Sequence, residues 1–184
     1  MKNNHTWVIC AYGESEFLEA CILSLQAQTL PSKIICYSST PLDSIKQLCQ
    51  KYGIPFYTKE GGGIGKDWNN ALSFVETSYA TIAHQDDYYE PTYLEAVMQK
   101  IEQSKDILIA YTDYFEEKNG VKIPANTNLK IKTLMLKTLN LMPSSRFWRN
   151  RILAFGNPIS CPAVTYNLET LRDFRFDEEM RVSL

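Results

Sequence analysis

The sequence predicts an α/β fold with a mostly parallel central sheet. Short apolar runs rich in β-forming residues alternate with amphipathic segments whose apolar residues recur at helical spacing. Clusters of Gly, Pro, Ser and Asn separate these segments. Such an alternation is typical of parallel strands joined by helices that cover the sheet. The 184 residues suit one domain, and 45% hydrophobic residues are enough for a sizeable core.

The individual elements follow from these patterns. Five strands are expected over residues 6–11, 33–37, 54–57, 79–84 and 106–115, where apolar and β-branched residues are dense. Four helices are expected between them, over residues 14–27, 41–52, 67–75 and 91–101. Thr40 is predicted to cap the second helix and Asp67 the third. Beyond a turn at Asn119-Gly120, we expect helices over 129–141 and 144–155 and a strand over 162–166.

Charge and composition exclude several classes of protein. Lys plus Arg is 19 and Asp plus Glu is 21, so the formal net charge is -2 and the whole chain has no electrostatic footprint for nucleic acid or an anionic membrane. No apolar run reaches the roughly 20 residues of a transmembrane segment, and the N-terminus lacks the apolar core of a signal peptide. The five widely spaced cysteines indicate reduced thiols of a cytosolic protein.

The strongest indication of chemistry is the segment of residues 84–91, His-Gln-Asp-Asp-Tyr-Tyr-Glu-Pro. Asp86 and Asp87 follow the fourth predicted strand, and ligands of open α/β sheets bind at the carboxyl ends of the strands. Two adjacent carboxylates repel each other unless a cation joins them, and Mg²⁺ or Mn²⁺ binds carboxylates together with phosphate oxygens. The alternative interpretation is a solvated loop that caps the next helix.

A glycine-rich loop at residues 61–65 precedes the third predicted helix. It matches neither the dinucleotide-binding pattern nor the P-loop, because Lys66 and Asp67 stand where those motifs need other residues. Its backbone amides and Lys66 are suited to an anion at a helix start, or the loop is a flexible turn. Trp68 either covers a nucleotide base or is itself a core residue. Asn69 either hydrogen-bonds a ligand or caps the start of the helix.

A cluster of basic residues lies late in the chain. Arg146, Arg149 and Arg151 share a predicted helix, where they could meet an anionic acceptor or form a solvated face.

Five segments of the chain match, in order and spacing, the motifs of one enzyme family. Residues 8–14 and 18–29 resemble its first strand and helix, which ends in Ser-Leu-x-x-Gln-Thr, and residues 65–72 resemble the segment before its metal motif. Residues 84–87, His-Gln-Asp-Asp, resemble its D-x-D-D motif, and residues 176–179 resemble the Phe-Asp-Glu before its catalytic acid. The chain therefore resembles the family 2 glycosyltransferases over nearly its whole length.

The resemblance implies a GT-A-like α/β/α sandwich with a Rossmann-like nucleotide-binding half. It implies one domain over residues 1–184, with a nucleotide-sugar-binding half at 1–115 and a partial acceptor-side half at 116–184. It also implies inverting transfer of a sugar from a UDP- or dTDP-type donor to a glycan or lipid-linked acceptor, in surface polysaccharide or glycoconjugate synthesis. Asp86 and Asp87 would hold Mn²⁺ or Mg²⁺. The residues expected to bind the donor are Ala11, Tyr12, Glu14, Ser38, Lys66, Asn69, His84, Gln85 and Asp86.

Two departures from the family pattern concern the donor. The second strand ends in residues 36–40, Cys-Tyr-Ser-Ser-Thr, without the carboxylate that meets the nucleotide base in relatives, so either other groups recognise the base or the donor differs. His84 replaces the first acid of D-x-D, which meets the ribose in relatives. A neutral imidazole can still bond a ribose hydroxyl, but it brings no negative charge.

A third departure concerns the catalytic base. The chain stops at Leu184, and the resemblance places the base motif just beyond this residue. Either the chain is a truncated protein or the protein has lost its base, and in both cases we expect poor turnover of the chain on its own. Asp113, Asp177 and Glu178 are the stand-in bases inside the chain.

Two alternatives belong to other classes. A non-catalytic module that binds nucleotide sugars fits a chain without its base. A sugar-nucleotide pyrophosphorylase fits less well, because residues 11–15 lack the basic residues of its loop. The expected location is cytoplasmic, or peripheral at the inner face of the membrane, without a transmembrane segment.

Overall fold

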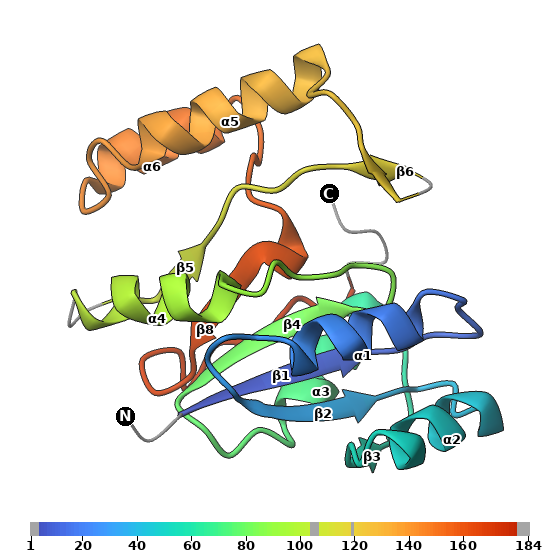
Figure 1. Ribbon diagram of the computed structural model, residues 1–184. Helices are drawn as coiled ribbons and strands as arrows, with labels where there is room; N and C mark the ends of the chain where they lie inside the picture. The colour runs from blue at the N-terminus through green and yellow to red at the C-terminus, as the bar shows by residue number, and fades with distance from the viewer. Residues whose placement is uncertain (1–3, 104–106, 119, 180–184) are drawn as a thin grey trace. The chain divides into compact units, whose positions relative to one another are not determined.

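The computed structural model describes residues 4–103, 107–118 and 120–179, and it confirms the α/β fold. A six-stranded sheet has the order β3-β2-β1-β4-β8-β5 (Figure 1). Its parallel strands are β1 (His5–Cys10), β2 (Lys33–Tyr37), β3 (Phe56–Tyr57) and β4 (Tyr79–His84). β8 (Val164–Asn167) runs antiparallel to β4, and β5 (Ile109–Tyr111) lies at the edge.

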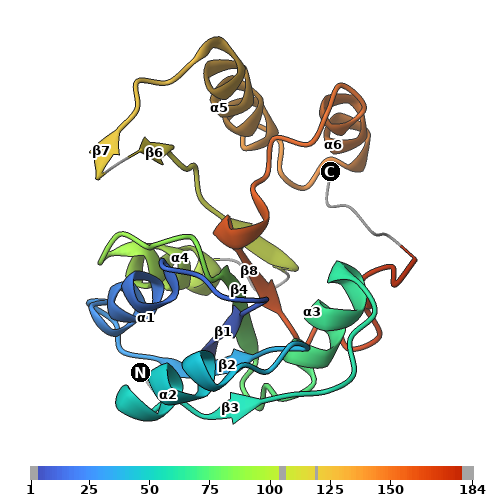
Figure 2. The ribbon, with the colours of Figure 1, turned by 90° about the vertical axis from the view of Figure 1, so that its right-hand side faces the viewer.

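Helices cover both faces of this sheet. α1 (Leu18–Gln26), α2 (Asp43–Lys51) and α4 (Tyr93–Glu102) pack on one face, and α3 (Ile64–Leu72) packs on the other (Figure 2). The alternation of side chains along β1 explains the two cores, because Trp7 and Ile9 face α1 and α4 while Val8 faces α3. The three layers are those of the α/β/α sandwich.

The chain divides into two compact units. The larger unit comprises residues 1–110 and continues again from residue 165, and the smaller unit comprises residues 111–164. The smaller unit contains the hairpin of β6 (Glu117–Lys118) and β7 (Val121–Lys122), α5 (Thr127–Leu139), α6 (Arg146–Leu153) and a 3₁₀ turn (Cys161–Ala163). Gly120 has a φ of 75° in the hairpin turn, as expected, whereas Asn119 lies outside the described residues.

Two predicted helix caps are wrong. Thr40 does not cap α2, which begins at Asp43, because its hydroxyl accepts a hydrogen bond from the backbone N–H of Gly13 at 3.0 Å. Asp67 does not cap α3, which begins earlier, at Ile64, so Asp67 lies inside the helix. In both cases the side chain has a tertiary partner that the local sequence does not indicate.

The lengths of two elements also differ from the prediction. The first helix begins at Leu18 instead of residue 14, after a turn in which the Ser15 hydroxyl accepts from the Phe17 backbone. The fifth strand covers Ile109–Tyr111 rather than residues 106–115. Hydrophobic periodicity locates an element but gives its ends poorly, because the ends depend on caps and pairing partners.

A row of hydrogen-bonded polar side chains lies within the apolar core beside Trp7. His5 is fully buried, with Nδ1 2.8 Å from the Ser32 hydroxyl and Nε2 2.9 Å from that of Thr81. The Thr81 hydroxyl lies 2.6 Å from that of Thr165. Burial lowers the pKa of His5 to about 3, because the imidazolium would lose its hydration. The imidazole is therefore neutral in the native state at neutral pH.

This buried histidine makes the fold sensitive to acid. The unfolded chain binds a proton at His5 near the ordinary pKa of about 6.5, whereas the folded chain binds it only near 3. Stability is therefore lost as the pH falls from about 6.5 towards 3, by at most about 1.4 kcal/mol per pH unit. In His5→Gln, which cannot take up the proton, we expect a flatter pH dependence of the unfolding free energy, measured by urea denaturation from pH 7 to pH 4.

His84→Gln is the matched control, because it removes the other histidine of the chain. Profiles of equal slope for His5→Gln and the unsubstituted protein would contradict the assignment.

Candidate functional site

The carboxyl ends of β1, β2 and β4 form one site, because the three strands are parallel neighbours. Cys10, the last residue of β1, lies opposite Tyr37 in β2 and His84 in β4. The Gln85 side chain joins the loops that follow: its Oε1 accepts from the Tyr12 N–H at 3.1 Å, and its Nε2 donates to the Tyr12 carbonyl at 2.8 Å. The loops after β1 and β4 are thereby held side by side.

Three potential metal ligands cluster at the carboxyl end of β4, whose last residue is His84. His84, Asp86 and Asp87 each offer one atom, and these atoms lie within 4.8 Å of one another. His84 Nδ1 faces the carboxylates, 3.8 Å from Asp87 Oδ2. Burial raises the pKa of Asp87 above its ordinary value, the charge of His84 opposes this, and Asp86 adds to it. Two carboxylates and one imidazole fit a divalent cation such as Mn²⁺, which accepts both ligand types.

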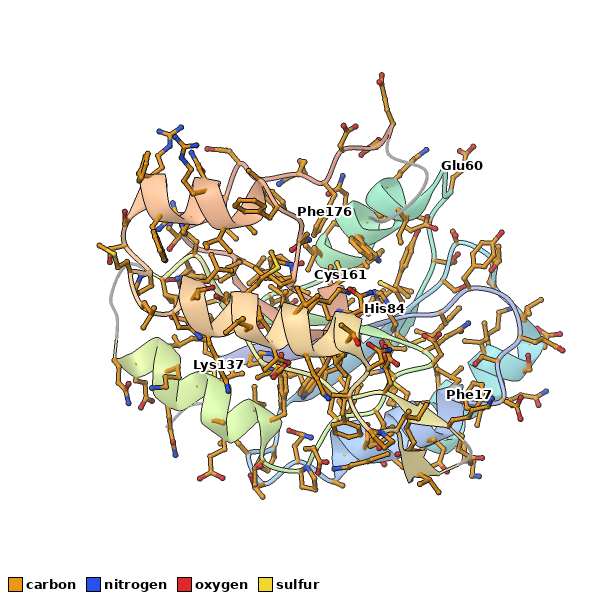
Figure 3. All side chains as sticks on the ribbon, turned by 90° about the horizontal axis from the view of Figure 1, so that it is seen from above. Phe17, Glu60, His84, Lys137, Cys161 and Phe176 are labelled. Carbon is orange, nitrogen blue, oxygen red and sulfur yellow. The ribbon has the colours of Figure 1, made fainter. Side chains whose placement is uncertain are left out.

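The imidazole of His84 is held by aromatic packing. Its ring lies 5.6 Å from that of Trp68 in α3, and the Trp68 ring meets Phe176 edge-on at 4.9 Å. Trp68 is buried, so it is a core residue of the site. Figure 3 labels the outer two residues of this row, His84 and Phe176. The segment around Phe176 is thus connected to the metal-ligand cluster through one tryptophan.

Asn69 fixes the Phe176 segment to α3. Its amide Nδ2 donates to the Phe176 carbonyl at 2.9 Å, and its Oδ1 accepts from the Phe176 N–H at 2.9 Å. Nδ2 also lies 3.1 Å from Glu178 Oε1. One turn earlier, Gly65 permits the close approach, because a Cβ at this position would overlap the carbonyl oxygen of Asp177. The pair Gly65 and Asn69 therefore forms a docking face for the C-terminal segment.

Asp67, in α3, places a carboxylate at the end of β2. Its Oδ2 accepts from the Ser39 hydroxyl at 2.9 Å, and its Oδ1 lies 3.4 Å from the Tyr37 hydroxyl. Gly61 passes so closely that a Cβ there would touch Oδ1 of Asp67. Burial raises the pKa of Tyr37, and the negative charge of Asp67 adds to the rise. The sequence has no acid at the end of β2, but the fold brings the carboxylate of Asp67 to that position.

The expected donor-binding residues take two kinds of position. Tyr12 and Glu14 are exposed in the loop after β1, and Lys66 lies along the glycine loop, with its side chain over Gly62. The other kind faces the protein itself: Ala11 and Ser38 are buried, Ser38 Oγ accepts from the Thr40 N–H, and the amides of Gln85 and Asn69 bind backbone. Because the side-chain amides of Gln85 and Asn69 already use their oxygen and a nitrogen on backbone groups, they hold the loops of the site in place.

The stand-in bases are also engaged. Asp177 Oδ1 accepts from the Glu179 N–H at 2.9 Å, and Glu178 is bound by Asn69. Asp113 belongs to the smaller unit, where its Oδ1 accepts from the Tyr114 N–H at 3.0 Å and lies 3.3 Å from the Thr133 hydroxyl.

The catalytic base that the sequence places just beyond Leu184 stays a prediction. Residues 180–184, Leu184 included, lie outside the described residues. The last described residues, 177–179, are those that Gly65 and Asn69 hold against α3.

Sequence reasoning missed Asp67 and Gly65. A strand end with hydroxyls but no carboxylate was a signal that an acid must come from elsewhere, and Asp67 is the acid nearest to the glycine loop on its C-terminal side. Gly65 had no comparable signal, because its partner at Asp177 is 112 residues away.

Known proteins resemble this chain along most of its length. The glycosyltransferase GlyA from Streptococcus pneumoniae is 24% identical over 123 residues, which are 63% of this chain and 18% of GlyA. The crystal structure of Staphylococcus aureus TarS 1-349 superposes with a TM-score of 0.70 at 20% identity, over 98% of this chain and 52% of that one. The mannosyltransferase PcManGT from Pyrobaculum calidifontis gives 0.64 at 11% identity, over 98% and 49%.

These structural likenesses confirm the GT-A-like fold, and this chain spans about half the length of the solved structures it matches. The family model described as "Glycosyl transferase family 2" matches residues 6–161, which include β1 from its second residue, the strands β2 to β4, the glycine loop and the metal-ligand cluster. The chain belongs to glycosyl transferase family 2.

Proposed function

We propose that this protein transfers a sugar from a nucleotide-diphosphate donor to an acceptor hydroxyl, and that donor binding depends on a divalent cation. The observation that carries the proposal is the cluster of His84, Asp86 and Asp87 at the carboxyl ends of the parallel strands, in a chain of glycosyl transferase family 2. Family membership favours this function over that of a pyrophosphorylase. A module that only binds nucleotide sugars stays as the alternative outcome.

The donor class is supported by the relatives. Crystal structures of TarS 1-349 contain UDP or UDP-GlcNAc, and the solved structure of PcManGT is a complex with GDP-Man and Mn²⁺. Because this chain matches about half of each of those proteins, the activity, the donor and the acceptor are all proposals here. We propose a UDP- or dTDP-type donor and Mn²⁺ or Mg²⁺ as the cation.

The chain's own residues would bind and orient the diphosphate. Asp86, with Asp87 and His84, would hold the cation, which when bound neutralises the negative charge that grows on the departing diphosphate. Lys66 lies beside the glycine loop, where its ammonium can meet a phosphate oxygen. Tyr12 is 69% exposed in the loop after β1 and offers its ring to the base or sugar. The Gln85 amide keeps that loop against the cation site.

The acceptor side is proposed more coarsely. Attack by a hydroxyl on the face opposite the leaving diphosphate gives inversion, and the hydroxyl must lose its proton to a carboxylate. We propose a glycan or lipid-linked acceptor in surface polysaccharide or glycoconjugate synthesis, at a cytoplasmic or peripheral membrane location. No helix in the described part of the chain is long and apolar enough to cross a membrane.

The first test measures cation-dependent donor binding. We expect UDP to bind in the presence of Mn²⁺ and to bind at least tenfold more weakly after chelation, by isothermal titration calorimetry. Asp86→Asn should weaken binding in Mn²⁺ by about tenfold to a hundredfold, because it removes a charged contact worth roughly 1.5–3 kcal/mol.

Asp43→Asn is the matched control, since Asp43 pairs with Lys46 on the exposed surface of α2. Equal UDP affinity with and without Mn²⁺ would contradict the cation site. Binding without any transfer to an acceptor would favour the binding module.

We also propose that Asp67 recognises the nucleotide base. A carboxylate accepts hydrogen bonds only, so it pairs with the imide N–H of uracil or thymine and repels the ring nitrogen that cytosine presents at the same place. The Ser39 hydroxyl and the close passage of Gly61 hold the Asp67 carboxylate at the end of β2, where ligands of such sheets bind. This agrees with the UDP- or dTDP-type donor.

The second test compares two pyrimidine nucleotides. The unsubstituted protein should bind UDP more tightly than CDP, and Asp67→Asn should bring the two affinities close together, because an amide can donate or accept. Glu60→Gln, which changes an exposed acid just before the glycine loop, should keep the preference. An unchanged UDP-to-CDP ratio in Asp67→Asn would mean that Asp67 only braces the glycine loop.

A further inference from the structure

Charge is distributed very unevenly along this chain. Residues 118–168 contain eight Lys or Arg and no Asp or Glu, so all 21 acidic residues lie outside this stretch. The formal net charge of -2 is therefore an average over an acidic part and a strongly basic part. The basic stretch includes both helices of the smaller unit, α5 and α6.

These two helices form one well-defined structural element. They lie side by side in both ribbon views (Figures 1 and 2), and the Trp148 indole N–H donates to the Thr138 carbonyl at 2.8 Å. Asn126 caps α5 through the Leu129 N–H at 2.8 Å, and Ser145 caps α6 through the Trp148 N–H at 3.3 Å. Each helix thus has its own N-terminal cap, and a side-chain hydrogen bond connects the two helices.

Cations and apolar side chains share the exposed faces of this element. Lys130, Leu134 and Lys137 follow one another in α5 at intervals of three or four residues, so they lie on one face, and Leu141 follows two residues after the helix ends. Leu141 is 72% exposed, and Leu134 is exposed as well.

α6 adds exposed aromatic side chains to these cations and aliphatic side chains. No residue of α6 is buried, and its exposed Phe147, at 67%, lies under the Arg151 guanidinium at 5.1 Å. Phe155, just after α6, is 87% exposed. Large apolar side chains in water are unfavourable unless a partner covers them.

We refer to this region as the basic–apolar surface. Its exposed members are Lys130, Ile131, Leu134, Lys137, Leu141, Met142, Arg146, Phe147, Arg149, Arg151, Leu153 and Phe155.

The cations of this surface lack acidic counter-charges. In the ranges that the structure describes, no ion pair involves a cation of α5 or α6, whereas three lysines of the larger unit pair with acids. Lys132 donates to the Tyr114 hydroxyl, and Arg149 donates to the Pro143 carbonyl, which are neutral acceptors. A partner that covers this surface must therefore supply negative charge and also accept large apolar side chains.

We propose that the basic–apolar surface docks the protein onto a membrane that contains anionic phospholipid. Lipid phosphates supply the negative charge, and the boundary between headgroups and acyl chains accepts side chains such as Phe147, Leu141 and Phe155. An apolar protein segment would leave the five exposed cations of α5 and α6 without counter-charge, and a nucleic-acid backbone would leave the aliphatic side chains in water. The helices are too short to cross a bilayer, so they lie on it.

Co-sedimentation of the full chain with vesicles tests this proposal. We expect binding to vesicles of phosphatidylcholine with about one quarter phosphatidylglycerol, weaker binding as salt is raised, and much weaker binding to phosphatidylcholine alone. The variant Arg146→Gln/Arg149→Gln/Arg151→Gln should bind the anionic vesicles about a hundredfold more weakly, because each surface cation contributes roughly 1 kcal/mol.

The matched control is Lys33→Gln/Lys46→Gln/Lys100→Gln, which removes the same charge from exposed positions of the larger unit. It should keep most of the affinity. A second variant, Leu141→Ser/Phe147→Ser, removes exposed apolar side chains and should lower the binding that persists at high salt. Circular dichroism verifies that each variant is folded.

Several results would overturn the proposal. These are no binding of the unsubstituted chain to anionic vesicles, equal losses in the two charge variants, or tighter binding to a single-stranded RNA than to the vesicles. No donor or acceptor is needed, so the result does not depend on the proposed transfer reaction.

Discussion

β1 is paired on both of its edges, with β2 and with β4, and the positions of the site residues depend on this pairing. The parallel register puts Cys10 between Tyr37 and His84, so the loops after the three strands begin at the same level of the sheet. A slip of one residue would turn each side chain to the opposite face of the sheet. The buried side chains on both faces of β1, Trp7 and Val8 among them, make such a slip costly.

The same constraint explains how distant parts of the chain meet. α3 follows the glycine loop and packs on the sheet face opposite α1, which brings Trp68 beside His84. Asn69 and Gly65, on the adjoining side of the helix, receive the segment at Phe176 and Asp177. One helix of nine residues thus contacts the metal-ligand cluster and a segment more than 100 positions later in the chain.

Periodicity predicted the layers of this fold because each element has its own apolar pattern. Residues 79–84 were predicted as a strand and form β4 with those bounds, and the acids that follow do lie at the site. The caps at Thr40 and Asp67 failed because local sequence rules consider only the helix that follows. Thr40 instead bonds to Gly13 and Asp67 to Ser39, and both partners come from other loops. Interactions that depend on strand order could not be read from a single segment.

Charge illustrates the same limit on a larger scale. A net charge of -2 suggested that the protein has no electrostatic preference for an anionic surface, yet one block of 51 residues carries eight cations and no acid. Screening confines electrostatic interactions to roughly 10 Å at moderate salt, so a surface responds to the charges near it and not to the total. The acids after β4 are suited to a cation, and the cations of α5 and α6 are suited to an anionic surface. Each unit therefore has to be matched with a partner according to its own local charge.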